Sequence, residues 1–176
     1  PRIASNREIS MQFTRTQPDL WHARAGEDGP DAHPQPYDHA LLTLERWHAV
    51  RDTWPTHFAA GVILSNTVDV ASLAPDLPRL SLIALQFPKW TDGRAYTQAR
   101  LLRQRHGYAG EIRAIGDVVV DMVPLLQRCG FSAVKLRADQ RIESAQQALG
   151  FIGAHYQGDA RGRLPVFRQS SQRQAA

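Results

Sequence analysis

LSLIALQFPKWTDGRAYTQARLLRQRHG, residues 80–107, contains the clearest strand and the clearest helix of the chain. Residues 80–87 form an apolar run, and after a polar loop the apolar residues of 95–106 recur at helical spacing. Asp92 is a favourable helix N-cap, and Gly107 permits the left-handed conformation that ends many helices. The stretch therefore predicts one strand–loop–helix unit.

The same alternation of short apolar runs and helix-like segments continues on both sides of this unit. We expect strands at 40–44, 62–64, 80–87, 112–116 and 131–136, and helices at 46–54, 68–77, 95–106, 118–129 and 140–156. Repeated strand–helix units are typical of an α/β fold with a mainly parallel sheet. The short spacing between strands leaves an open sandwich and a partial barrel as alternatives.

The ends of the chain differ in composition from its centre. We expect an N-terminal arm at 1–36, a single α/β domain at 37–158 and a C-terminal tail at 159–176. Within the arm, apolar and polar residues alternate over 9–13, and Leu20-Trp21 begins a second apolar segment. These two segments predict a short β extension, arranged as a small hairpin that precedes a Pro- and Gly-rich linker at 26–36.

Composition narrows the class of protein. The 176 residues are 43% hydrophobic and 22% charged, which is ordinary for a globular domain. The single cysteine predicts no disulfide, and the chain has no run of about 18 apolar residues that would span a membrane, so we expect a cytoplasmic protein. The net charge of +4 comes without a dense basic tract, so nucleic-acid binding is not predicted. The spacing of the histidine and cysteine residues does not match that of a metal site. The sequence also contains no dinucleotide-binding or phosphate-loop motif, so no cofactor is predicted.

The best candidate site is the loop that follows the strand at 80–87. Ligands of parallel sheets bind at the carboxyl ends of the strands. At this end, Lys89 and Arg94 would attract an anion, and Asp117 follows the next strand. We expect these loops to open at one end of the sheet and to gather their charges into one hollow. In a purely structural alternative, Asp92 caps its helix and Arg94 pairs with Asp117.

Two further cations lie inside predicted strands. Arg113 and Lys135 would make a cationic pocket if both faced inward, whereas a salt-bridged or exposed face, with Glu111 beside Arg113, is the default interpretation. If the chain is an enzyme, its catalytic candidates are Asp92, Arg94, Asp117 and Asp121.

The segment FPKWTDGRAYTQARLLRQRHGYAGEIRAIGDVVVDMVPLLQRCGF, residues 87–131, resembles the signature of a bacterial family known as domain of unknown function 934. The resemblance is strongest at Phe87-Pro88, Thr91-Asp92-Gly93-Arg94, Ala99-Arg100-Leu101-Leu102-Arg103, Gly107-Tyr108, Gly110-Glu111, Arg113-Ala114, Gly116-Asp117-Val118, Asp121 and Arg128-Cys129-Gly130-Phe131. The family's usual DGRGYS is here Asp92 to Thr97, with Ala95 in place of glycine and Thr97 in place of serine.

The resemblance implies a role in sulfur assimilation, because members of the family are typically encoded beside assimilatory sulfite or nitrite reductase and are often described as oxidoreductases of sulfite reduction. Our first hypothesis is an accessory protein that binds sulfite reductase or a small oxyanion through Lys89, Arg94 and Arg113. The second is an oxidoreductase or other enzyme acting with a borrowed cofactor. The third is a structural interaction module.

Overall fold

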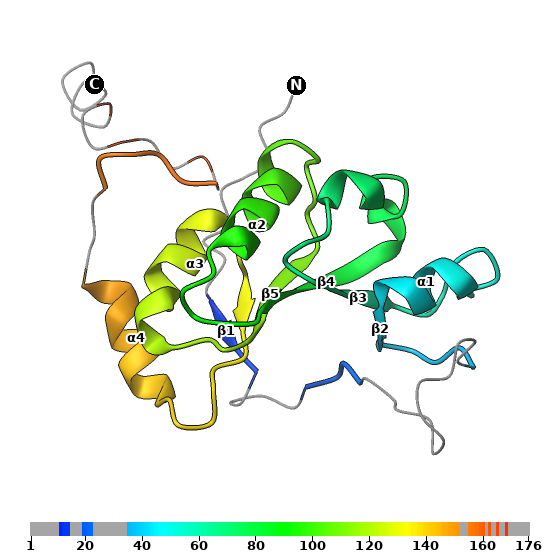
Figure 1. Ribbon diagram of the computed structural model, residues 1–176, viewed down its shortest axis with the longest axis horizontal. Helices are drawn as coiled ribbons and strands as arrows, with labels where there is room; N and C mark the ends of the chain where they lie inside the picture. Colours follow the sequence, from blue (N-terminus) through cyan, green and yellow to red (C-terminus); the bar gives the residue numbers. More distant parts are fainter. Residues whose placement is uncertain are drawn as a thin grey trace.

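β4 (Leu80–Phe87) lies near the middle of a six-stranded parallel sheet in the computed structural model, which describes residues 11–14, 19–22, 35–151, 155–160, 162, 165 and 168. The strand order is β1-β6-β5-β4-β3-β2, from the left of Figure 1 to the right. The other strands are β1 (Gln12–Phe13), β2 (Ala40–Thr43), β3 (Ala60–Leu64), β5 (Glu111–Gly116) and β6 (Ala133–Val134). The sheet is open, so the α/β prediction is confirmed as an open sheet and not as a barrel.

The helices cover one face of this sheet. They are α1 (Leu44–Val50), α2 (Arg94–Gln104), α3 (Val123–Cys129) and α4 (Ile142–Gly150), with short 3-10 turns η1 (Val70–Leu73), η2 (Leu77–Arg79) and η3 (Val120–Met122). From β2 to β6 each crossover moves one strand in the same direction, and right-handed crossovers then place every connection on the same side. Ile83 and Leu85 belong to the core that these helices bury, whereas Leu82 and Ala84 do not.

Leu82 and Ala84 face the other side of the sheet, where residues 19–22, here called the N-terminal strap, lie. Trp21 lies against Gly61, where an added Cβ would meet the Trp21 ring at 2.9 Å. His22 forms a parallel bridge to Ala40 at the β2 edge, although β1 pairs with β6 at the opposite edge. The expected hairpin is therefore wrong, because its two segments join opposite edges of the main sheet.

The other differences from the predicted elements also have local causes. Residues 68–77 form no α-helix, because Pro75 and Pro78 remove backbone donors and leave only η1 and η2. Pro124 lies in the first turn of α3, where its missing N–H costs nothing, so this helix starts at Val123 without a kink. Gly130 ends α3 in the left-handed conformation, with a φ of +103°.

Candidate functional site

Polar side chains follow β3, β4, β5 and β6 at the end of the sheet where each strand finishes. We call this set the C-terminal rim, and it consists of Asn66, Asp92, Arg94, Asp117, Arg137 and Asp139. The loop between β4 and α2, residues 88–93, crosses the middle of the rim. Hydrogen bonds hold this loop from both sides.

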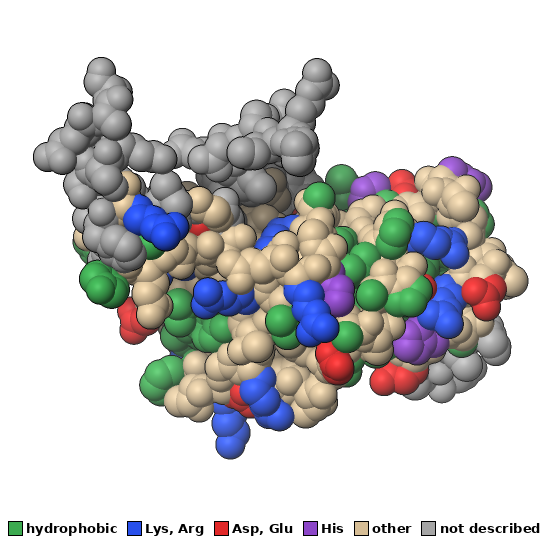
Figure 2. Space-filling model, turned by 90° about the horizontal axis from the view of Figure 1, so that it is seen from above, with side chains coloured by type: hydrophobic (Ala, Val, Ile, Leu, Met, Phe, Trp, Pro, Cys, Tyr) green, Lys and Arg blue, Asp and Glu red, His purple; other side chains and the backbone are tan. Residues whose placement is uncertain are grey.

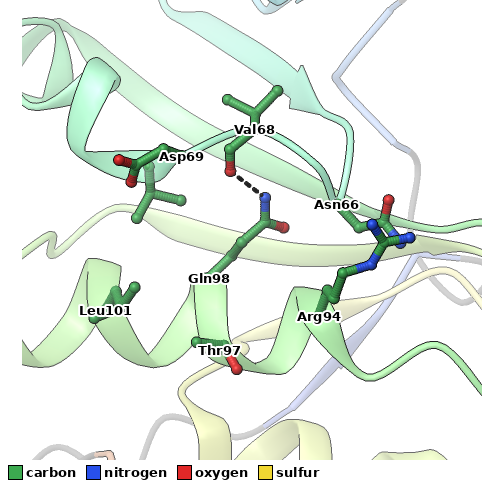
Figure 3. Close-up of a pocket in the computed structure, with 8 residues that line it drawn as sticks. Asn66, Val68, Asp69, Arg94, Thr97, Gln98 and Leu101 are labelled. Carbon is green, nitrogen blue, oxygen red and sulfur yellow. Dashed lines mark hydrogen bonds between the residues drawn. The ribbon is translucent and has the colours of Figure 1, made fainter.

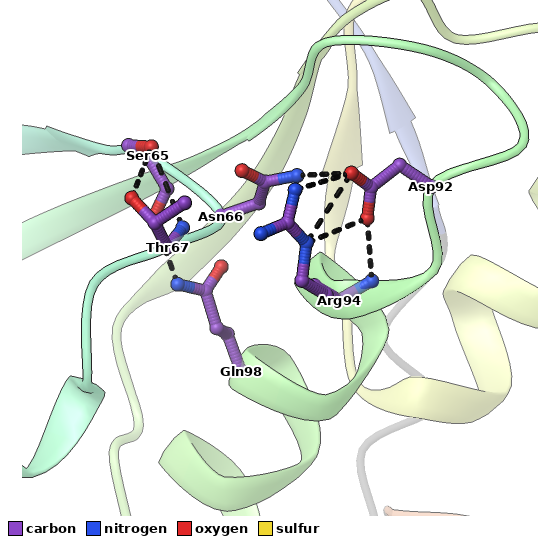
Figure 4. Close-up of polar contacts among 6 residues, drawn as sticks. All are labelled: Ser65, Asn66, Thr67, Asp92, Arg94 and Gln98. Atoms are coloured by element: carbon purple, nitrogen blue, oxygen red, sulfur yellow. Dashed lines mark hydrogen bonds and ion pairs between the residues drawn. The ribbon is translucent and has the colours of Figure 1, made fainter.

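Asp92 holds one side of the loop. Its carboxylate accepts a hydrogen bond of 2.8 Å from the Asn66 amide and bonds of 2.6 and 3.0 Å from the Arg94 guanidinium (Figure 4). The backbone N–H of Arg94, the first residue of α2, also donates to it. Arg94 is the main cause of a strongly lowered pKa of Asp92, so this carboxylate stays ionised at neutral pH. The N-cap position itself is Gly93, one residue later than predicted.

Asp117 holds the other side of the loop. Its carboxylate accepts a hydrogen bond of 2.8 Å from the Arg137 guanidinium and one of 2.9 Å from the backbone N–H of Trp90. These two bonds lower the pKa of Asp117. Arg137 is shared with Asp139 through bonds of 2.7 and 2.5 Å. Gly116 makes the turn before Asp117, because its φ is +96° and a Cβ there would meet the Phe87 carbonyl oxygen at 2.4 Å.

The rim is thus two linked groups and not the single charged hollow that the sequence predicted. Arg94 pairs with Asp92 and not with Asp117, whose partner is Arg137. The two arginines also line different cavities, Arg94 beside α2 and Arg137 on the helix-free face. What joins the groups is the backbone of residues 90–92.

The cavity beside α2 has a volume of about 270 Å³ and separates this helix from the segment that follows β3 (Figure 3). Gln98, which is 94% buried, spans the gap. Its side-chain amide donates hydrogen bonds of 2.9 Å to the Ser65 carbonyl and 2.8 Å to the Val68 carbonyl. Arg94 lies at one end of the cavity, and Val68, Val70 and Leu101 give it mainly apolar walls. This bridge fixes the start of α2, and with it the loop at 88–93.

The loop carries an exposed aromatic side chain. Trp90 is 57% exposed although its backbone is bonded to Asp117. Lys89 precedes it and is exposed, and within the described part of the chain it forms no ion pair. The Arg94 side chain is 58% exposed despite its bond to Asp92. Asp121 lies apart from the rim residues, exposed on η3.

Arg113 lies on the helix-free face and is only 5% exposed. Its guanidinium bonds Glu111 at 2.7 Å and Asp19 of the strap at 2.8 Å. The salt-bridged interpretation is therefore confirmed, and Arg113 offers no free charge to an anion. Lys135 faces the same side but is exposed, so the two cations do not form a closed pocket.

Sequence reasoning missed three residues of these sites. Asn66 directly follows an apolar strand, and the rule that selected Asp117 would also have found it. Trp21 and Gly61 gave no such signal, because they are 40 positions apart in the sequence. Their contact lies on the helix-free face of the sheet, and the hydrophobic periodicity of the sequence does not show which segment covers that face.

Two structural findings and two comparisons with known proteins complete the description. Within the described residues, no three His, Cys, Asp or Glu side chains group closely enough to hold a metal ion. None of the described helices is both long and apolar enough to cross a bilayer. No curated protein matches the chain. A family model matches residues 61–167, well over half of the chain, and the protein therefore belongs to the family described as bacterial protein of unknown function (DUF934).

Proposed function

We propose that this protein is a binding accessory of assimilatory sulfite reduction that contacts a protein partner, sulfite reductase, through the C-terminal rim. The observation that carries the proposal is Trp90, a large exposed side chain between Lys89 and Arg94 on a loop bonded at both ends. Tryptophan and arginine are the residues most often found at the energetic centres of protein interfaces. A loop that is already fixed loses little entropy when it binds.

The state of the carboxylates favours binding over acid–base catalysis at the rim. Asp92 and Asp117 both have lowered pKa values because arginines and backbone N–H groups bond them. A general acid or base works best when its pKa lies near the working pH, and these two lie far below it. Their bonds instead position the loop that carries Trp90.

Charge favours a protein partner over a free oxyanion. Arg94 and Arg137 are each engaged by carboxylates of the rim, so an oxyanion would have to compete with Asp92, Asp117 and Asp139. On the face seen in Figure 2, the described Lys and Arg side chains are dispersed among acidic and apolar ones. Lys89 forms no ion pair within the described residues, so an acidic patch on a partner can pair with it without displacing the loop's own bonds.

The pathway in the proposal is supported by the family and its association with sulfite reductase, and is tested genetically. We expect a strain that lacks the gene to grow on cysteine but poorly on sulfate, and the wild-type gene to restore growth. A gene encoding the Trp90→Ala variant should restore growth less well than one encoding Phe151→Ala, which removes another exposed aromatic side chain at the end of α4. Equal growth of the deletion strain on both sulfur sources would contradict the assigned pathway.

Direct binding tests the partner. Calorimetry of the full chain with purified sulfite reductase should show binding that Trp90→Ala weakens about ten-fold or more, as truncation of an interface centre does. Phe151→Ala should bind like the wild type. Absence of binding, or equal loss in both variants, would contradict the proposed surface. Reduction of sulfite by the purified chain with added flavin would instead favour the oxidoreductase hypothesis.

A further inference from the structure

A second cavity adjoins the C-terminal rim at Arg137 and opens on the face of the sheet that the helices leave uncovered. It is an open groove of about 910 Å³. The N-terminal strap covers the half of this face nearer the strand starts, where Leu82 and Ala84 are fully buried. Among the residues that the structure describes, none covers the half nearer the strand ends, and Gln86 and Lys135 are exposed there.

The floor of the groove is mainly aliphatic. Leu41, Ile63 and Ile115 come from β2, β3 and β5, and Gln86 of β4 lies between the last two. Trp21 of the strap also lines the groove. With strands about 4.8 Å apart, the four spacings from β2 to β6 give a floor about 19 Å long. Natural small-molecule sites have volumes in this range and combine apolar walls with polar groups, which here come from Asp19, His22, Gln86, Arg113, Lys135 and Arg137.

The charges of the groove are unequal. Arg113 is neutralised by Glu111 and Asp19, and Arg137 is engaged by Asp117 and Asp139. Lys135 lines the groove beside Ile115 and, within the described residues, forms no ion pair. One available cation therefore lies at one end of an aliphatic floor.

We propose that this groove binds a small amphipathic anion whose apolar body lies across β3 to β5 and whose single carboxylate or sulfonate pairs with Lys135. An apolar body covers the half-exposed side chains of Ile63 and Ile115, which the protein's own helices leave in contact with water. The anionic group supplies a charged partner for Lys135, which has none in the part of the chain that the structure describes. This site adjoins the Trp90 surface through Arg137 and Asp117 but uses other side chains, and it goes beyond the accessory function proposed above.

Three probes that have the same alkyl chain length but differ in charge test the proposal: octanoate, 1-octanol and octylamine. In calorimetry with the full chain we expect octanoate to bind most tightly and octylamine most weakly. Lys135→Met should weaken the binding of octanoate about three- to five-fold, as expected for the loss of a partly exposed ion pair. The same variant should bind 1-octanol with unchanged affinity. Lys89→Met, which removes an exposed lysine of the loop at 88–93, is the matched control and should not alter the binding of any of the three probes.

A floor variant separates the apolar contact from the charge. Ile115→Thr keeps a β-branched side chain in β5, so the strand should form, and it should weaken octanoate and 1-octanol alike. Amide NMR shifts on adding octanoate should fall in β3, β5 and residue 135. If this variant fails to fold, the Lys135→Met comparison still decides.

Several outcomes would overturn the proposal. These are equal affinity for all three probes, an equal loss of octanoate binding in Lys89→Met, and no binding of any probe. Binding to anionic vesicles without binding of free octanoate would place a membrane on this face and would overturn it as well.

Discussion

The C-terminal rim and the strap-covered face both join arginines to carboxylates, but in opposite surroundings. At the rim, the Arg94 and Arg137 side chains remain 58% and 44% exposed beside their partners. Beneath the strap, the Arg113 side chain is buried, although its partners Glu111 and Asp19 keep 22% and 32% of their side chains exposed. Exposed ion pairs contribute little because water solvates both states, whereas a buried charge depends on its partners. The rim bonds therefore serve to position a loop, and the Arg113 bonds serve to hold the chain's N-terminal part onto the sheet.

The largest effect should follow from removing the buried cation. Arg113→Ala leaves Glu111 and Asp19 facing each other without a counter-charge, and we expect it to lower the free energy of unfolding by about 2–3 kcal/mol. Urea denaturation measures this loss. Arg137→Ala, at the exposed rim, is the matched variant and should lose much less. Equal losses in the two variants would remove the contrast between the two regions.

The next effect concerns the contact that attaches the strap. Gly61→Ala places a Cβ 2.9 Å from the Trp21 ring and 3.0 Å from Leu82 Cβ, and we expect a loss of about 1–2 kcal/mol from overpacking. In a Trp21→Ala background the ring is absent, so the same substitution should cost less. A double-mutant cycle in urea denaturation measures this coupling. Additive losses would show that the ring does not rest on Gly61 in solution.

These two regions also differ in how far the sequence predicted them. Strands β2 to β6 were identified because parallel strands buried on both faces are apolar runs, such as 80–87, and Gly107 was recognised as a helix end because glycine has no Cβ to oppose positive φ. The rule that strand ends meet at one edge predicted that Asp92 and Asp117 lie at the same end of the sheet, and they lie on the two sides of the loop at 88–93.

What the sequence did not predict depends on contacts between distant residues. Arg94 could have paired with either Asp92 or Asp117, and only the path of the loop at 88–93 decides between them. Similarly, Leu20-Trp21 was expected to pair with its neighbour in the chain. It instead crosses to β2 because Gly61 leaves room for the Trp21 ring and Arg113 offers a charge to Asp19. No periodicity encodes that choice.

A smaller effect concerns acid stability at the rim. Asp117 has a lowered pKa in the folded protein, so its contribution to stability is present above its ordinary value of 3.8 and is lost as pH falls through the lowered value. Asp117→Asn should therefore lower the melting temperature at about pH 7, and the difference from wild type should shrink at about pH 3. Thermal unfolding at both pH values measures it. Asp121→Asn, an exposed carboxylate outside the rim, is the control and should show no such change.

The smallest effect on stability should come from Lys135, although it lies on the same face as Arg113. Its side chain is exposed, and no carboxylate among the described residues would lose an ion-pair partner on substitution. Lys135→Met should therefore change the free energy of unfolding by less than about 0.5 kcal/mol. Urea denaturation beside Arg113→Ala measures the contrast. A large loss would mean that Lys135 is a structural cation like Arg113 and not one available to a ligand. A neutral result, together with weakened octanoate binding, would separate the two cations of this face, with Arg113 holding the strap and Lys135 facing the open groove.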